Sequence, residues 1–274
     1  MIPAAFDYER ADSTDAAVAL LTDHGDEAKV LAGGMSLLPL MKLRLAVPSV
    51  LIDVGRLDEL SYVRDADDHL AIGALTRHRD LETSTVLRDG CGMLRAVTAE
   101  VGDNQVRHRG TIGGSVAHGD PASDLPGALL ALDATFVARG PSGEREIAAA
   151  AFFTGFLETA LAPDELLTEI RVPKTGPNGF SYQKFNRRAQ DYAIVGALAV
   201  RVEGASRVAL VNMGPTPLRA VGVEAALASG ASAADAAEHA AEGTEPSGDL
   251  NAGVEYREQL ARVLTRRALE AAGA

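Results

Sequence analysis

The chain has 274 residues, of which 47% are hydrophobic, and it carries a formal net charge of −12. This length suits one large domain or two medium ones, and an acidic balance is opposite to that of most nucleic-acid-binding proteins. The chain has no run of about 18 uncharged apolar residues that would predict a membrane-spanning helix. Its N-terminus lacks the basic and apolar regions of a signal peptide, so we expect a cytoplasmic protein.

The first 58 residues predict a compact α/β unit with a partly parallel sheet. Ser13 is expected to cap a helix of about ten residues, which Gly25 ends. Residues 29–32 are typical of a short buried strand, which Gly33-Gly34 breaks before Ser36 opens a second helix. Residues 50–53 form another apolar run of strand length.

Residues 59–175 predict a second unit. We expect a strand at 70–74 and a later helix that places Met93, Leu94, Val97 and Val101 on one face. Residues 140–143 predict a hairpin turn between two strands, and residues 165–172 a strand that Pro173 ends. The single cysteine, Cys91, excludes an intrachain disulfide and is expected to be a small buried apolar residue.

The segment 175–179, with two glycines and a proline, predicts a domain boundary. Three strands are expected after it, at 180–186, 193–202 and 207–213, followed by helices that include a short one at 231–241. The last helix is expected to share one apolar stripe, made of Tyr256, Leu260, Val263, Leu264 and Leu269. The prediction is therefore a domain at 1–175, with subdomains of about 1–58 and 59–175, and a domain at 176–274.

Two glycine-rich segments carry the strongest functional signal: residues 31–37, Leu-Ala-Gly-Gly-Met-Ser-Leu, and residues 110–115, Gly-Thr-Ile-Gly-Gly-Ser. Paired glycines let a ligand approach the backbone closely, and the N–H groups of a following helix suit a phosphate. Neither segment fits the Rossmann or P-loop pattern. From the residues alone they are either structural turns or a dinucleotide or phosphate site of unknown class.

The two segments resemble the FAD-pyrophosphate motifs of the FAD-binding subunits of molybdenum hydroxylases, the group of aerobic carbon monoxide dehydrogenase and xanthine dehydrogenase. Residues 1–3, 119–121 and 266–268 resemble the carbon monoxide dehydrogenase branch most. The resemblance implies an α+β fold of the vanillyl-alcohol-oxidase type. Two α/β subdomains would be followed by a C-terminal domain with a small antiparallel sheet and helices.

The resemblance also implies a set of FAD contacts, namely Lys29, Leu31, Ala32, Gly33, Gly34, Met35, Ser36, Leu37, Thr111, Gly114, Ser115, Ser123, Asp124, Leu167, Lys184, Asp191 and Tyr192. Met35 and Ser115 depart from the polar residue and the asparagine that are familiar in relatives, which leaves an FAD-free scaffold as an alternative. Tyr192, the candidate catalytic residue, either covers the flavin or anchors a core. Asp124 either bonds the flavin or its ribityl chain, or forms an Asx turn.

The implied function is an oxidoreductase subunit that passes electrons through FAD. Partner subunits would hold two [2Fe-2S] clusters and the molybdenum cofactor in a dimer of heterotrimers, at the inner face of the membrane if the partners bind there. The acceptor is a quinone, NAD or oxygen. A xanthine-type or N-heterocycle-type subunit and a self-sufficient flavin oxidase remain alternatives. No metal site is expected in this chain, and a patch for partner subunits is expected at Arg107, Arg109, Arg187 and Arg188.

Overall fold

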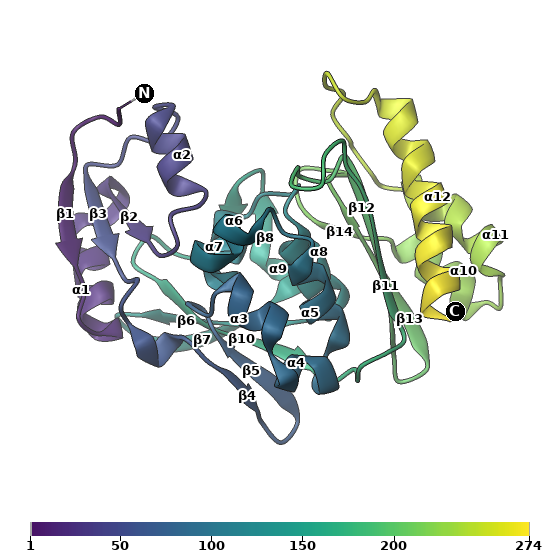
Figure 1. Ribbon diagram of the computed structural model, residues 1–274, viewed down its shortest axis with the longest axis horizontal. Coiled ribbons are helices and arrows are strands. Elements are labelled where there is room, and N and C mark those ends of the chain that lie inside the picture. Colours follow the sequence, from purple (N-terminus) through teal and green to yellow (C-terminus); the bar gives the residue numbers. More distant parts are fainter. Residues whose placement is uncertain (1, 274) are drawn as a thin grey trace.

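The computed structural model describes residues 2–273 and contains three larger sheets and one small hairpin, which follow one another along the long axis (Figure 1). The first sheet has three parallel strands in the order β1-β3-β2. Its elements are β1 (Asp7–Arg10), α1 (Thr14–His24), a 3-10 turn (Gly25–Glu27), β2 (Ala28–Leu31), α2 (Leu37–Lys42), β3 (Val50–Asp53) and a second 3-10 turn (Asp58–Leu60).

The start and stop of α1 confirm the sequence-based prediction. The Ser13 hydroxyl accepts a hydrogen bond from the Ala16 N–H, and Gly25 takes a positive φ of 53° at the other end. The strand predicted at 29–32 is present as β2, but the expectation that it is buried is wrong, because only Ala28 of β2 is buried. The strand lies at the edge of the sheet and faces the pocket described below.

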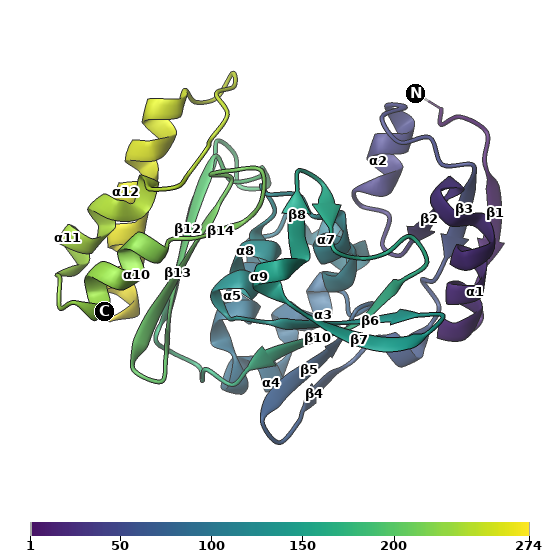
Figure 2. The same cartoon turned by 180° about the vertical axis from the view of Figure 1, so that it is seen from behind.

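The second sheet is antiparallel, in the order β4-β5-β10-β6-β7, and its central strand pairs Ile170 with Ile72 on one side and Phe136 on the other. Helices cover one of its faces, as Figures 1 and 2 show from opposite sides. The strands are β4 (Val63–Asp65), β5 (His69–Gly73), β6 (Thr135–Gly140), β7 (Gly143–Ala148) and β10 (Leu166–Pro173), and the short hairpin is β8 (Phe153–Gly155) and β9 (Glu158–Thr159). The helices are α3 (His78–Thr83), α4 (Thr85–Gly90), α5 (Gly92–Ala99), α6 (Asn104–Arg109), α7 (Ile112–His118), α8 (Asp124–Ala131) and α9 (Ala149–Phe152).

The third sheet is buried on both faces. Leu198 and Val211 pack into the core of the second sheet and its helices, whereas Ala197 and Leu210 pack against the C-terminal helices. A strand with two buried faces has a continuous apolar sequence, as residues 195–200 of this sheet do. Its antiparallel strands are β11 (Phe180–Phe185), β12 (Val195–Val202), β13 (Ala205–Val211) and β14 (Leu218–Arg219), covered by α10 (Val221–Ala228), α11 (Ala233–Ala237), a 3-10 turn (Glu238–Ala241) and α12 (Val254–Ala272).

Several predicted details differ from the structure. Strands β1, β4, β8, β9 and β14 were not expected, and the apolar stripe of α12 does not include Tyr256, whose side chain is 48% exposed. The next residue, Arg257, is buried in its place together with Ala261 and Leu264. Cys91 is buried as predicted. No helix within residues 2–273 combines the length and the apolar character needed to cross a membrane.

Replacement of Phe136 by alanine tests the core of the second sheet. Phe136 is fully buried, and its ring centroid lies 4.4 Å from that of Phe152. We expect the free energy of unfolding to fall by about 3–5 kcal/mol, because truncating a buried aromatic ring leaves a cavity. Urea unfolding measures the change. The control Phe156→Ala, at a side chain that is 65% exposed, should change it by about 0.5 kcal/mol or less; equal losses in both variants would contradict this account.

Candidate flavin site

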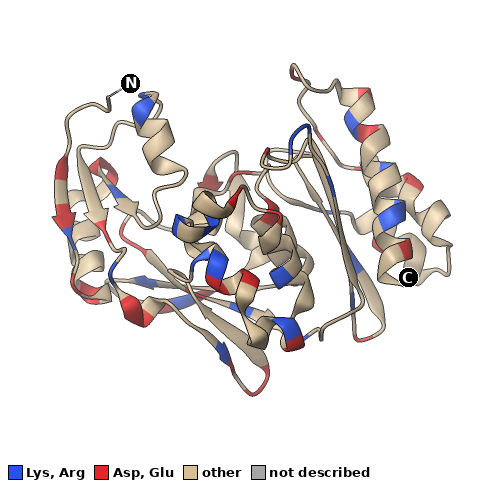
Figure 3. Ribbon diagram, in the orientation of Figure 1, with Lys and Arg blue, Asp and Glu red and all other residues tan. Residues whose placement is uncertain are grey.

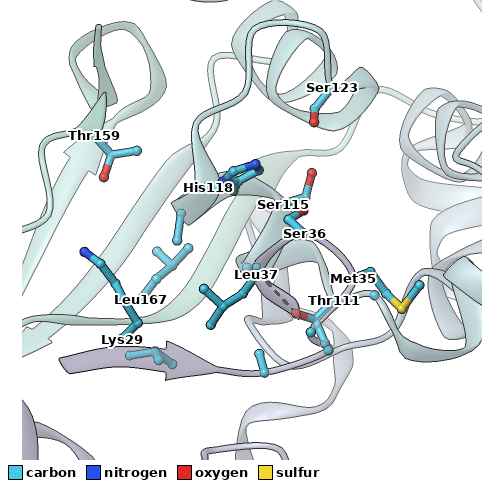
Figure 4. Close-up of a pocket in the computed structure, with 18 of the residues that line it drawn as sticks. Lys29, Met35, Ser36, Leu37, Thr111, Ser115, His118, Ser123, Thr159 and Leu167 are labelled. Atoms are coloured by element: carbon cyan, nitrogen blue, oxygen red, sulfur yellow. Dashed lines mark hydrogen bonds between the residues drawn. The ribbon is translucent and has the colours of Figure 1, made fainter. Parts of the chain in front are cut away.

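A pocket of about 920 Å³ is lined by residues of all three larger sheets. Its walls include the end of β2, the N-terminus of α7 and the loop between β11 and β12. Ligand sites of this size are typical for cofactors and are mostly apolar with a few convergent polar groups. Figure 4 shows such polar groups in the pocket, with the hydroxyls of Ser36, Ser115 and Ser123 near one another and Lys29 at some distance from them.

The two glycine-rich segments meet backbone to backbone. A Cβ atom placed on Gly33 would lie 2.2 Å from the carbonyl oxygen of Arg109, so no side chain fits at this position. Gly34 has a positive φ of 75°, which turns the chain toward α2. The close approach therefore brings residues 33–37 beside the segment that opens α7.

The first segment offers free backbone donors. Among the residues that the structure describes, no protein acceptor receives a hydrogen bond from the N–H groups of residues 33–37. The N-cap of α2, Ser36, makes no capping hydrogen bond with its side chain either. Unsatisfied N–H groups at the start of a helix suit an anion, so this wall of the pocket can hold a phosphate group.

The second segment differs, because most of its backbone N–H groups are already bonded. Gly113 N–H donates to Ala74 O at 2.8 Å, and Gly114 N–H donates to Thr111 Oγ1 at 3.1 Å. Thr111 and Ser115 keep their hydroxyl hydrogens as donors. A Cβ on Gly114 would meet only Thr111 Oγ1 within 4 Å, so its bare Cα otherwise faces open space. This wall therefore offers hydroxyl groups and room for a ligand.

A buried ion pair closes the side of the pocket next to the third sheet. Lys184 Nζ donates to Asp124 Oδ2 at 2.8 Å and to Glu100 O at 2.9 Å, and the Tyr182 hydroxyl also donates to Asp124. Burial raises the pKa of Asp124, while Lys184 opposes that shift. The Asx turn proposed for Asp124 is instead made by Asp120, whose Oδ1 accepts from Ala122 N–H at 2.9 Å.

Tyr192 lies at the mouth of the pocket and not in a core. Tyr192 is 56% exposed, so the alternative that it anchors a core is wrong. Partial burial, together with the negative charges of Asp120 and Asp124, raises the pKa of its hydroxyl, and a hydrogen bond with Ser36 acts in the opposite direction. The C-terminal part of the chain thus contributes Tyr192 to the same pocket as the first glycine-rich segment.

All of the predicted FAD contacts line the pocket except Leu31. Its neighbours Val30 and Ala32 both line the pocket. The sequence analysis missed other lining residues, which come from separate helices, strands and loops without a shared motif: His78, Val101, Gly102, Thr154, Glu158 and Thr159. Within residues 2–273, no group of three or more His, Cys, Asp and Glu side chains is placed to bind a metal ion.

His78 is the least expected wall residue. It is 4% exposed, and its Nδ1 atom has no hydrogen-bond partner within the described part of the chain. Burial and the nearby Arg107 lower its pKa from 6.5 to about 4. The imidazole is therefore neutral at pH 7.

The predicted basic patch is only partly present. Arg107 is not available for a partner, because its side chain is 12% exposed and its Nε donates to Glu82 at 3.0 Å. Arg109, Arg187 and Arg188 are exposed. Figure 3 shows basic residues on α6 and on the loop between β11 and β12.

Two family models match the chain. Residues 4–175 match the FAD binding domain in molybdopterin dehydrogenase, and residues 180–272 match the CO dehydrogenase flavoprotein C-terminal domain. The chain belongs to the FAD-binding medium subunits of the molybdenum hydroxylases. This assignment confirms the predicted family and the presence of an FAD-binding domain in an oxidoreductase flavoprotein.

Relatives of this flavoprotein subunit cover its whole length. It is 40% identical to the carbon monoxide dehydrogenase medium chain of Hydrogenophaga pseudoflava, over 100% of this chain and 99% of that one. It is 38% identical to the 6-hydroxypseudooxynicotine dehydrogenase complex subunit alpha of Paenarthrobacter nicotinovorans, over 98% of this chain and 95% of that one. The solved carbon monoxide dehydrogenase of H. pseudoflava matches with a TM-score of 0.94 and 40% identity, over 100% and 99% of the two chains, which confirms the predicted α+β flavoprotein fold.

The pocket of the flavoprotein subunit fits a dinucleotide. The unbonded N–H groups of residues 33–37 suit a pyrophosphate, and the bare Cα of Gly114 leaves space for it. The volume of about 920 Å³ lies within the range of ligand sites. The residues of this chain therefore fit the cofactor that the family model names.

Substitution of the two glycines by valine separates their roles. Gly114→Val should weaken FAD binding by about 100-fold or more, or about 2.7 kcal/mol, since the side chain enters the pocket. Its unfolding free energy should change by about 1 kcal/mol through the disturbed Thr111 cap. Gly33→Val should instead lose about 1–3 kcal/mol of stability, because its side chain collides with Arg109. Flavin titration and urea unfolding measure both effects; wild-type FAD affinity in Gly114→Val would refute the site.

The buried imidazole predicts a pH effect on the stability of the flavoprotein subunit. Between pH 6.5 and about 4, His78 binds a proton in the unfolded chain but not in the folded chain. The free energy of unfolding should therefore decrease as the pH falls through this window, by up to about 3 kcal/mol from this residue. His78→Gln should flatten that slope in urea titrations, whereas His108→Gln, at an exposed histidine, should not. Identical slopes in wild type and His78→Gln would contradict the assignment.

Proposed function

We propose that the chain is the electron-transfer subunit of a molybdenum hydroxylase of the carbon monoxide dehydrogenase type. The observation that carries the proposal is the pocket between the two glycine-rich segments, with free N–H groups on one wall and hydroxyls on the other. Bound FAD would supply the redox chemistry, and the protein would bind it, orient it and tune it. The proposed FAD-binding domain is 1–175, and the proposed C-terminal domain is 176–274.

Each wall of the pocket has a separate proposed task. The N–H groups of residues 33–37, including that of Met35, bind the pyrophosphate, and Thr111 and Ser115 donate hydroxyl hydrogen bonds from the other side. Leu31 supports this segment from behind. Tyr192 covers the flavin and limits access to it. The remaining proposed contacts lie along the same pocket: Lys29, Ser123, Asp124, Leu167, Lys184 and Asp191.

Two titratable side chains of the pocket wall are poorly suited to a self-sufficient substrate dehydrogenase. Such an enzyme needs a group that removes a proton from its substrate. The carboxylate of Asp124 is already paired with Lys184, and His78 is buried. A subunit that only exchanges electrons with neighbouring clusters needs no such base, which favours the subunit over the self-sufficient oxidase.

The proposed partners are a small subunit with two [2Fe-2S] clusters and a large subunit with the molybdenum cofactor, in a dimer of heterotrimers. FAD would take electrons from the clusters and pass them to a quinone, NAD or oxygen. Contact with the inner face of the membrane would come through these partners. A second candidate, the flavin subunit of an N-heterocycle dehydrogenase, is supported by the 38% identity to the 6-hydroxypseudooxynicotine dehydrogenase subunit.

Purification with and without the partner subunits tests the proposal. We expect the chain to co-purify with both partners and to bind one non-covalent FAD, visible in the flavin absorption spectrum. The isolated chain with FAD should reduce no dye when carbon monoxide or an N-heterocycle is added, because it lacks substrate chemistry. Dye reduction by the complex with one of these two substrates would separate the two candidates. Substrate-dependent dye reduction by the isolated chain would overturn the proposal, and a chain without flavin would support the scaffold alternative.

A further inference from the structure

Two loops from different parts of the chain contribute to the wall of the pocket. The loop between β11 and β12 brings Gln190, Asp191 and Tyr192 to the pocket, and the loop between α7 and α8 brings Ser123. The first loop has no helix or strand of its own between Asn186 and Ile194. Its position over the pocket therefore depends on hydrogen bonds to the rest of the fold.

Asn212 contacts both loops. This residue directly follows β13, and its backbone N–H donates to Pro121 O at 2.9 Å. Its side-chain Nδ2 donates to Ala193 O at 2.8 Å and to Ile194 O at 3.3 Å. Asn212 thus links the loop between α7 and α8 to Ala193 and Ile194, the two residues that directly follow Tyr192.

The backbone of Asn212 is in an unusual conformation. Its φ is +61°, in the left-handed region that disfavours residues with a side chain. Glycine would adopt this conformation at no steric cost, but glycine has no side-chain donor. Strained backbone residues that persist often serve a functional site, and here the strain aims the amide group at two carbonyl oxygens.

The base of the Tyr192 loop has other anchors. Ile194 N–H donates to Phe185 O at 2.7 Å, and the buried Arg257 donates to Ile194 O. Arg257 is held in turn by Asp249 at 2.8 Å. These contacts fix Ile194, so the particular contribution of Asn212 is the hydrogen bond to Ala193, one residue from Tyr192.

We propose that Asn212 is a positioning residue that holds Tyr192 over the flavin pocket by tying the two loops at its mouth together. The proposal rests on the proposed role of Tyr192 as the cover of the flavin. It requires the side-chain amide and not only the left-handed backbone. Loss of the amide should release the loop and expose the flavin without unfolding the chain.

Asn212→Gly is the informative variant. Glycine keeps the left-handed backbone and the N–H that donates to Pro121, and it removes only the side-chain donors. Glu203→Gly is the matched control, because Glu203 also has a positive φ, of 52°, and is exposed in the turn between β12 and β13. Both variants are made in the full chain.

The first measurement is cleavage by trypsin after Arg187 and Arg188, two exposed residues of the loop, followed by mass spectrometry. In the FAD-free chain we expect cleavage to be about fivefold faster in Asn212→Gly, since loss of one hydrogen bond shifts local opening by about that factor. Glu203→Gly should match the wild type. Equal rates in Asn212→Gly and Glu203→Gly would overturn the proposal.

The second measurement is quenching of flavin fluorescence by iodide in the FAD-bound chain. We expect Asn212→Gly to increase quenching, and Tyr192→Ala to increase it as well. If Asn212 acts through Tyr192, the double variant should be quenched no more than Tyr192→Ala alone. Additive increases would overturn the proposal.

Two further outcomes are distinguishable. If the wild type binds no FAD, the proposed function fails, while the trypsin measurement on the FAD-free chain still decides whether Asn212 orders the loop. Asn212→Asp keeps the size of the side chain and replaces the donor by a carboxylate oxygen, so it should be cleaved at least as fast as Asn212→Gly. Trypsin cleavage after Arg262 in α12 reports on the rest of the fold. If Asn212→Gly and Asn212→Asp accelerate this cleavage as much as they accelerate cleavage in the Tyr192 loop, the fold is lost generally and the positioning role is overturned.

Discussion

The pocket depends on a backbone-to-backbone contact between two units of the fold. The carbonyl of Arg109 occupies the space that a side chain at Gly33 would need, with a separation of 2.2 Å from a Cβ placed there. A second contact of the same kind seats Gly113 on the backbone of Ala74. Because these glycines let segments of the backbone touch, the free N–H groups of residues 33–37 come to lie beside the hydroxyls at the start of α7. A side chain at Gly33 would separate the two walls of the flavin site, and one at Gly113 would displace α7 from Ala74.

The third sheet completes the site because both of its faces are apolar. One face packs on α8 and the core of the second sheet, and the other is covered by α12. This arrangement directs Lys184 into the pocket wall, where it pairs with Asp124. A buried ion pair adds little net stability, since desolvation of both charges offsets their attraction, but removal of one partner is costly. We infer that the pair fixes how the sheet meets α8 more than it stabilises the fold.

Local groups and not the overall charge make the pocket suitable for an anionic cofactor. The chain carries a formal net charge of −12, which opposes a phosphate at long range. The site compensates with backbone N–H groups, hydroxyls and the exposed Lys29 on β2. Two acidic groups of the wall are paired, Asp124 with Lys184 and Glu165 with Arg145. Donors of this kind act over a few ångströms, so they can bind a phosphate even in a protein whose net charge is also negative.

The sequence by itself determined the features that depend on neighbouring residues. The cap and stop of α1, the hairpin of β6 and β7, and the long strands of the third sheet follow from local patterns, and the two glycine-rich segments indicated the site and the family. Strand β1 could not be predicted, because three of its four residues (Asp7–Arg10) are charged, the strand is largely exposed, and it is held by pairing with β3. Only the tertiary structure decided that Leu31 does not line the pocket, that Arg107 is paired, that His78 is part of the wall, and that Asn212 contacts both loops beside it. These outcomes depend on contacts between residues far apart in the chain, and no local pattern records them.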